Sequence, residues 1–133
     1  MEKILVDTDV IIDFLRGFEE HAKSIITAIQ RKRVKGWISL VSITELYAGN
    51  DTVDDRKRES LEQLLPLFSI APPDLSIAKH AGILKRQYSL ALADAYIAAT
   101  CIEENFSLAT FNTKHFRNIR HLKLYNSQSQ KYE

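Results

Sequence analysis

Four polar residues that lie far apart in the chain could together bind a divalent metal ion. Three are acids and one is an amide: Asp7, Glu45, Asp94 and Asn112. Carboxylates that converge in a crevice repel one another and need a compensating cation, and their hard oxygens suit Mg²⁺ or Mn²⁺. Such an ion binds substrate phosphates and can supply a bound water as the attacking hydroxide. If the fold gathers these side chains, they predict metal-assisted hydrolysis of a phosphate ester.

Each of these residues also has a purely structural explanation. Asp7 could cap the helix that follows it. Glu45 ends a capping box, Ser42-Ile43-Thr44-Glu45, in which its carboxylate would fold back on its own helix terminus. Asp94 could cap its helix, and Asn112 could be a turn residue. A lone charge in an otherwise apolar helix is costly unless it is paired or binds a metal, so the structural explanation is weakest for Asp94.

The elements that would position these residues can be read from the apolar pattern. Short apolar runs predict strands at residues 3–6, 37–41, 69–71, 107–111 and 122–125. Helices are expected from Val10, from residue 18 or 19 to the basic group at 31–33, over 42–48, after a charged loop at 51–59, from Asp74, and over 92–102. Gly49-Asn50 should end the third helix in a left-handed turn, and Asn105 should cap the last one.

Strands that alternate with helices predict an α/β fold with a parallel, helix-covered sheet. Right-handed crossovers then bring several strand ends to one edge, where the ligand crevice of an open parallel sheet lies. Asp7 ends the first strand, and Glu45 lies just past the second. Asp94 opens the helix that leads into the fourth strand, and Asn112 follows that strand. The predicted fold therefore gathers all four at one edge.

Length and composition fit one globular domain. The chain has 133 residues, of which 45% are hydrophobic and 26% charged, and we expect a domain over residues 1–125 with a polar tail at 126–133. No apolar run approaches the ~20 residues of a membrane helix, and the start does not resemble a signal peptide, so a cytoplasmic location is expected. The single cysteine, Cys101, cannot form an internal disulfide and should be a core residue.

The charge distribution carries more information than the net charge of +1. Several basic clusters are typical of solvated helix faces, at residues 31–35, 56–58 and 85–86. The cluster near the C-terminus is dense enough to be a phosphate-contacting surface, with Lys114, His115, Arg117, Arg120, His121 and Lys123.

Four motifs occur in order along nearly the whole chain. They are Val6-Asp7-Thr8-x-Val10-Ile11, Ser42-x-Thr44-Glu45-Leu46 with Gly49, Leu92-x-Asp94-Ala95-x-Ile97-Ala98-Ala99, and Thr110-x-Asn112-x-x-His115-Phe116. Together they resemble the PIN-domain ribonucleases and, more narrowly, the VapC toxins of VapBC toxin-antitoxin pairs. Four motifs at matching spacing are far more specific than any one of them.

The resemblance implies a five-stranded parallel sheet in the order 3-2-1-4-5 with helices on both faces, and a Mg²⁺- or Mn²⁺-dependent endoribonuclease. Asp7, Glu45 and Asp94 match the metal-binding acids of the family, and Asn112 matches its fourth active-site position. Single-stranded or loop RNA is the implied substrate, because its backbone and bases are accessible. The family also implies a VapB-like antitoxin that occupies the active-site groove, and homodimerisation.

Two positions depart from the family pattern. Asn112 stands where many PIN nucleases have an acid, which puts a complete second metal site in doubt. Asp9 stands where many members have asparagine, and its charge could either strengthen metal attraction or point away from the site.

The same residues fit three other classes of protein less well. The stretch 4–9 also resembles the start of haloacid-dehalogenase-type phosphatases, but those favour Thr or Val where Ile11 stands, and a convincing downstream acidic element is missing. A receiver domain would need an acidic pair ahead of the strand-end acid, and this chain lacks such a pair. The non-enzymatic alternative is a PIN-like scaffold that binds RNA or protein without cutting; three acids retained at ligand positions speak against it.

Overall fold

The central strand of the sheet is the one that leads to Asp7. In the computed structural model, which describes residues 1–17 and 20–126, the strands β1 (Lys3–Val6), β2 (Lys35–Ser39), β3 (Ser69–Ala71), β4 (Ser107–Ala109) and β5 (Lys123–Leu124) form one parallel sheet. Their order is β3-β2-β1-β4-β5, which confirms the predicted topology. β1 and β4 are neighbours, so the winding of the chain reverses between them.

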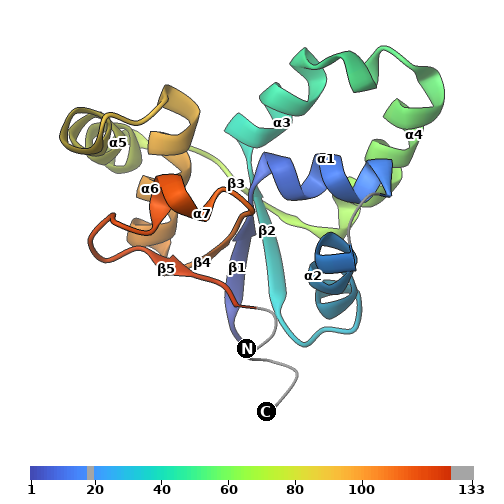
Figure 1. Ribbon diagram of the computed structural model, residues 1–133, viewed down its shortest axis with the longest axis horizontal. Coiled ribbons are helices and arrows are strands. Elements are labelled where there is room, and N and C mark those ends of the chain that lie inside the picture. Colours follow the sequence, from blue (N-terminus) through green and yellow to red (C-terminus); the bar gives the residue numbers. More distant parts are fainter. Residues whose placement is uncertain (18–19, 127–133) are drawn as a thin grey trace.

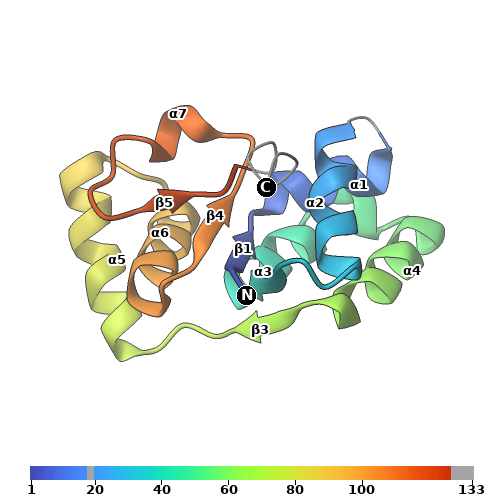
Figure 2. The ribbon, with the colours of Figure 1, turned by 90° about the horizontal axis from the view of Figure 1, so that it is seen from below.

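Helices cover both faces of this sheet, as predicted. They are α1 (Thr8–Arg16), α2 (Glu20–Gln30), α3 (Leu40–Ala48), α4 (Asp55–Leu64), α5 (Leu75–Tyr88), α6 (Leu92–Glu104) and α7 (Thr113–Phe116), with 3-10 turns η1 (Asn50–Thr52) and η2 (Leu65–Leu67). Figures 1 and 2 show α5 and α6 on one side of the strands, and α1, α2 and α4 on the other. Within the described residues, no helix is long and apolar enough to cross a membrane.

Alternation along β1 divides the core into two halves. Ile4 and Val6 pack with α1, α2 and α4 on one face, while Leu5 packs with α5 and α6 on the other, and all three side chains are fully buried. A strand buried on both faces reads as a continuous apolar run, which explains the opening sequence. The alanine-rich α6 is central, as predicted, because its small buried side chains allow close packing.

The predicted start of α3 was wrong. The helix begins at Leu40 because Ser39 is its N-cap and accepts a hydrogen bond from the backbone N–H of Val41 at 3.1 Å. β2 therefore ends at residue 39 rather than 41. Ser42 lies inside the helix, where its fully buried hydroxyl has no hydrogen-bond partner among the described residues. The capping-box explanation of Glu45 is thereby excluded.

The expected left-handed end of α3 was also wrong. Gly49 has an extended backbone, with φ −79° and ψ 165°, and its N–H donates to the carbonyl of Glu45. The Thr52 hydroxyl lies 3.2 Å from the carbonyl oxygens of Leu46, Tyr47 and Gly49. The Thr52 hydroxyl can thus donate to one of the carbonyls at the end of the helix, and the chain continues without a left-handed residue.

Other boundaries differ by a few residues for local reasons. α4 starts within the predicted charged loop, because Asp54 caps it by accepting from the N–H groups of residues 56 and 57. α2 ends before the basic group, where Lys32 adopts a left-handed φ of 59°. β4 ends at Ala109, two residues early, and the short helix α7 was not predicted. Asn105 caps α6 in the left-handed conformation, as predicted. The predicted tail beyond residue 126 lies outside the described residues.

Gly36 provides a test of packing between β2 and α2. A Cβ at this position would lie 2.7 Å from Cδ1 of the buried Ile29, so we expect Gly36→Ala to destabilise the protein by about 1–3 kcal/mol. Gly82→Ala is the matched control, because nothing lies within 4 Å of its new methyl group inside α5. This control should gain about 0.5–1 kcal/mol from helix propensity. Urea unfolding measures both, and equal stability of the two variants would contradict the prediction.

Candidate active site

Asp7 lies where the two central strands end. Its backbone N–H donates to the carbonyl of Ala109 at 2.9 Å, which extends the pairing of β1 with β4 by one residue. Its Oδ1 accepts from the Thr8 N–H at 2.8 Å, and its Oδ2 accepts from the Thr110 hydroxyl at 2.8 Å. Asp7 is therefore the N-cap of α1 and, at 6% exposure, also a buried acid at the carboxyl edge of the sheet.

The Thr110 hydroxyl joins Asp7 and Asp9 to the end of β4. Besides its short bond to Asp7, it lies 3.4 Å from Oδ2 of Asp9. A hydroxyl has one proton, so Asp7 at 2.8 Å is the stronger acceptor. The same oxygen accepts from the backbone N–H of Asn112 at 3.0 Å. Thr110 thus fixes two carboxylates and the turn after β4 relative to one another.

Asp9 lies against the end of β4 rather than pointing away from the other acids. Its Oδ2 accepts from the backbone N–H of Phe111 at 3.3 Å. Its Oδ1 is buried and has no hydrogen-bond partner among the described residues. A buried carboxylate oxygen without a partner is costly, so this atom is available for a ligand.

Burial makes ionisation of all three aspartates costly. Burial raises the pKa of Asp7 to about 7, and the nearby charge of Asp9 raises it further, against the hydrogen bonds from Thr110 and Thr8. Burial also raises the pKa values of Asp9 and Asp94. Because the charge of Asp94 raises the pKa of both other acids, the three carboxylates share one electrostatic environment.

Asp94 is held at the start of α6. The helix begins at Leu92, so Asp94 is in its first turn and is not the cap that the structural alternative required. Its Oδ2 lies 3.9 Å from Nδ1 of His115, and the proximity of this imidazole partly offsets the raised pKa of Asp94. The same Nδ1 lies 2.7 Å from the side-chain nitrogen of Asn112. His115 therefore connects Asp94 with Asn112.

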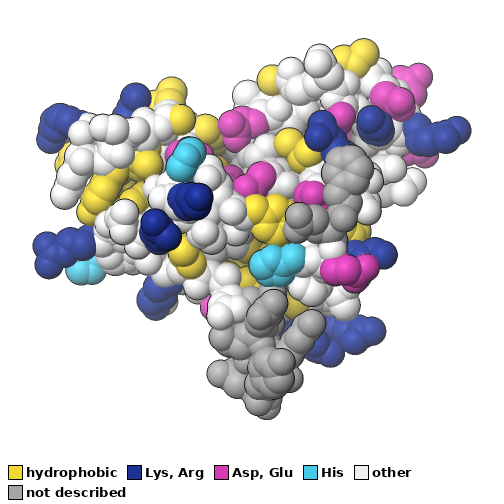
Figure 3. Space-filling view, in the orientation of Figure 1, with side chains coloured by type: hydrophobic (Ala, Val, Ile, Leu, Met, Phe, Trp, Pro, Cys, Tyr) yellow, Lys and Arg dark blue, Asp and Glu magenta, His cyan; other side chains and the backbone are white. Residues whose placement is uncertain are grey.

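Glu45 joins the site through α1. The Thr8 hydroxyl donates to Oε1 of Glu45 at 2.7 Å, which connects the first turn of α1 with the middle of α3. Glu45 is solvent-exposed, unlike Asp7. Figure 3 shows acidic side chains gathered in the hollow between α1, α3 and α7.

The residues predicted from the sequence are thus brought to one crevice, with different degrees of contact. Asp7, Asp9 and Asp94 interact electrostatically, while Glu45 and Asn112 are connected to them through intervening side chains. Within residues 1–17 and 20–126, no three acid, histidine or cysteine side chains form a ready-made metal cluster. The donor set still fits a hard divalent cation, since it consists of carboxylate oxygens with raised pKa values and one unpartnered buried oxygen.

Removing the Thr110 hydroxyl should raise the pKa of Asp7, which this hydroxyl contacts. Thr110→Val deletes a hydrogen bond that lowers the pKa of Asp7, so we expect this pKa to rise further. The variant should also lose about 1–2 kcal/mol of stability, because the Asn112 N–H loses its acceptor. Thr110→Ser keeps the hydroxyl and is the control. A carboxyl-carbon NMR titration of Asp7 gives the answer, and an unchanged midpoint in Thr110→Val would rule out this role.

The protein belongs to the class of α/β proteins that have helices on both faces of a parallel sheet. Such proteins bind ligands at the carboxyl ends of the strands, at the point where the winding of the chain reverses, and here buried acids lie at that point. Within that class, the match over residues 4–122 is to the PIN domain, and the chain belongs to this family. It is 37% identical over 125 residues to Ribonuclease VapC10 of Mycobacterium tuberculosis, with 90% of each chain covered. It is 30% identical to Ribonuclease VapC of Rickettsia bellii, over 91% of this chain and 93% of that one.

Solved structures agree with the fold. A toxin-antitoxin complex from Klebsiella pneumoniae has a chain with a TM-score of 0.74 and 28% identity, covering 93% of this chain and 97% of that one. FitAcB from Neisseria gonorrhoeae gives a TM-score of 0.74 at 27% identity, over 94% and 98% of the two chains. The resemblance to VapC ribonucleases that the four motifs indicated is thereby confirmed.

Proposed function

We propose that this protein is a metal-dependent endoribonuclease, the toxin of a toxin-antitoxin pair, which hydrolyses phosphodiester bonds in single-stranded or loop RNA. The observation that carries the proposal is the negative charge that Asp7, Asp9 and Asp94 would carry together where β1 and β4 end, which the nearby imidazole of His115 offsets at Asp94 only in part. Such charge requires a cation, and a cation beside a phosphate is the basis of phosphodiester hydrolysis. The similarity to Ribonuclease VapC10 supports RNA as the substrate.

Asp7, Asp94 and Glu45 would hold Mg²⁺ or Mn²⁺, with the unpartnered oxygen of Asp9 beside them. When bound, the ion would lower the pKa of a water and neutralise charge on the phosphoryl oxygens. The chain itself keeps these groups in place: Thr110 fixes Asp7, and Thr8 fixes Glu45.

The remaining polar groups act on water and substrate. Glu45 is exposed, so its carboxylate can orient the attacking water. Asn112 can donate a hydrogen bond from its amide to a water or a phosphate oxygen. Its amide nitrogen is 2.7 Å from His115 in the present structure, so the two side chains would exchange this contact for contacts with RNA.

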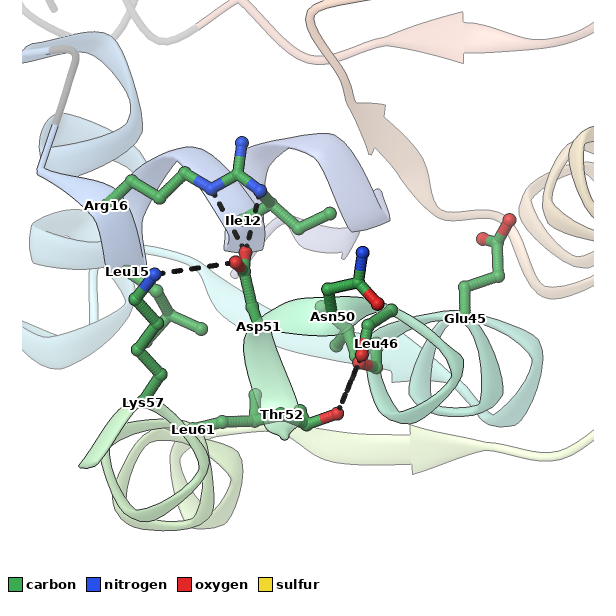
Figure 4. Close-up of a pocket in the computed structure, with 11 residues that line it drawn as sticks. Ile12, Leu15, Arg16, Glu45, Leu46, Asn50, Asp51, Thr52, Lys57 and Leu61 are labelled. Carbon is green, nitrogen blue, oxygen red and sulfur yellow. Dashed lines mark hydrogen bonds and ion pairs between the residues drawn. The ribbon is translucent and has the colours of Figure 1, made fainter. Parts of the chain in front are cut away.

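An apolar groove beside the site supports the antitoxin part of the proposal. The groove lies between α1, α3 and α4, with Ile12, Leu46 and Leu61 among its lining residues, and Glu45 stands at one end (Figure 4). Asp51 is 2.8 Å from Arg16 across its rim. An apolar segment of a VapB-like antitoxin laid in this groove would reach Glu45 and so block the site. We include homodimerisation, which the family resemblance implies, in the proposal.

The proposal is tested with purified protein and structured RNA. We expect internal cleavage in Mg²⁺ or Mn²⁺, with defined ends that sequencing can map, and no cleavage in excess EDTA. Undiminished cleavage in EDTA would overturn the metal-dependent mechanism. Binding of RNA without cleavage under any of these conditions would favour the non-catalytic scaffold instead.

A further inference from the structure

A second pocket opens on the other side of the acids. We call it the α5–α7 pocket; it has a volume of about 360 Å³ and is lined by Tyr88, Leu90, Asp94, Lys114, His115 and Asn118, among others. These residues come from the end of α5, the connection to α6, the start of α6, and α7 with the turn that follows. Its volume falls within the range of small-ligand sites.

The pocket is continuous with the active site. Asp94 and His115 line the pocket, and both also belong to the network around the acids, with 3.9 Å between their nearest oxygen and nitrogen. An RNA chain whose cleaved phosphodiester lies beside Asp7 and Asp94 must therefore pass one wall of this pocket. A nucleotide next to the cleaved bond would lie within reach of it.

The lining combines three kinds of group that a nucleotide needs. Lys114 supplies a cation, and within residues 1–17 and 20–126 no carboxylate pairs with it. Asn118 supplies an amide whose side chain has no hydrogen-bond partner in the same ranges. Tyr88 supplies an aromatic ring that is held in place, since its hydroxyl accepts from the backbone N–H of Arg120 at 3.2 Å. Buried Leu90 adds an apolar floor.

The surrounding charge favours RNA over a peptide as the occupant. α7 carries Lys114 and His115, and Figure 3 shows a histidine and basic side chains gathered over this helix next to the acidic hollow. Two further basic residues, Arg117 and Arg120, follow between α7 and β5. The groove between α1, α3 and α4 has an apolar floor that includes Ile12, Leu46 and Leu61, and among its charged residues Arg16 and Lys57 both pair with Asp51. The two pockets therefore differ in chemistry.

Resting on the proposed ribonuclease function, we propose that the α5–α7 pocket is the subsite for the nucleotide that adjoins the cleaved phosphodiester. Lys114 contacts the phosphate of this nucleotide, and Tyr88 packs against its base. Asn118 hydrogen-bonds the base edge, so it contributes to the choice of sequence at the cleavage site. The subsite thus recognises a single-stranded ribonucleotide through its base as well as its charge.

Binding can be tested without catalysis. We would titrate each of the four nucleoside 5′-monophosphates, and inorganic phosphate as a separate probe, into the metal-free protein and follow amide shifts by NMR. The proposal expects saturable shifts at Tyr88, Leu90 and Asn118 with at least one nucleotide, and much smaller shifts with inorganic phosphate. Shifts that are equal for phosphate and nucleotides, or absent from these residues, would overturn the nucleotide subsite. Because no cleavage is needed, this result is independent of whether the nuclease function holds.

Cleavage assays on variants then distinguish the roles of the residues that line the α5–α7 pocket. Lys114→Ala should raise KM for a short RNA about 3–10-fold with little change in kcat, since a phosphate contact adds binding that is the same in the ground and transition states. Asn118→Ala should change the base preference at one position beside the cut about tenfold. Lys23→Ala, an exposed lysine on α2, is the matched control.

Equal effects of Lys114→Ala and Lys23→Ala on KM, or an unaltered cleavage pattern in Asn118→Ala, would overturn the assignment. Wild-type protein that cuts no RNA would instead refute the proposed function, and the NMR titration would still decide whether the pocket binds nucleotides.

Discussion

Replacing Asp94 with asparagine should reduce metal-dependent RNA cleavage by at least about 100-fold. The charge of Asp94 acts on both Asp7 and Asp9, so its loss weakens the attraction of the whole site for a divalent cation. Loss of outer partners of a metal ligand alone costs about 10–100-fold, and a ligand should cost more. Initial rates on a defined RNA at saturating Mg²⁺ measure the effect.

The fold of this variant should be preserved, because asparagine is nearly isosteric and Asp94 is not a helix cap. Asp54→Asn is the matched control: it is also an aspartate at a helix start, it is exposed, and asparagine can cap α4 equally well. The control should cleave at the wild-type rate. Asp94→Asn with wild-type activity would remove Asp94 from the site.

Metal-free protein should lose stability as pH rises from about 4 to about 7. The pKa of Asp7 is about 7 in the folded protein and near 3.8 when unfolded, so the folded state binds this proton more tightly. The stabilisation that Asp7 provides is fully present below its pKa in the unfolded chain. It is lost as pH rises toward its pKa in the folded protein. The loss is on the order of 3 kcal/mol, because one pKa unit corresponds to about 1.4 kcal/mol.

Urea unfolding in EDTA at about pH 5 and pH 8 measures this loss. Asp7→Asn cannot ionise and should lack most of it, so the variant should be more stable than wild type at the higher pH. Saturating Mg²⁺ should restore wild-type stability at pH 8 and leave Asp7→Asn nearly unchanged. Wild type and Asp7→Asn with the same pH dependence would show that burial of Asp7 carries no such cost.

The sequence was sufficient for the fold because its strongest signals are regular. Ile4, Leu5 and Val6 form a run that only a doubly covered strand explains, and the alanines of α6 require close packing. The start of α3 was harder, since Ser39 and Ser42 both precede apolar residues and both can cap a helix. The sheet decides between them: Ser39 is in register with Ala71 of β3, so the strand extends to it and the helix follows.

The residues of the candidate site could be predicted from the sequence, but the contacts between them were harder to predict. Asp7 and Asp94 could be named because one follows the end of β1 and the other lies in the first turn of α6, and Glu45 could be named because it comes shortly after the second strand. The contacts of Asp9 with Thr110 and Phe111 join residues about one hundred positions apart, and they depend on how β4 ends relative to α1. The only advance signal for Asp9 was its spacing of two residues from Asp7.

Helix α1 links the acids at the end of β1 with the apolar groove. Its first turn carries Asp9 and is capped by Asp7, and its later turns place Ile12, Leu15 and Arg16 in the wall of the apolar groove. A partner that binds in the groove and shifts α1 would also move the carboxylates at its start. Occupation of the groove and the affinity of the acids for a cation would then be coupled, and by linkage each would alter the other.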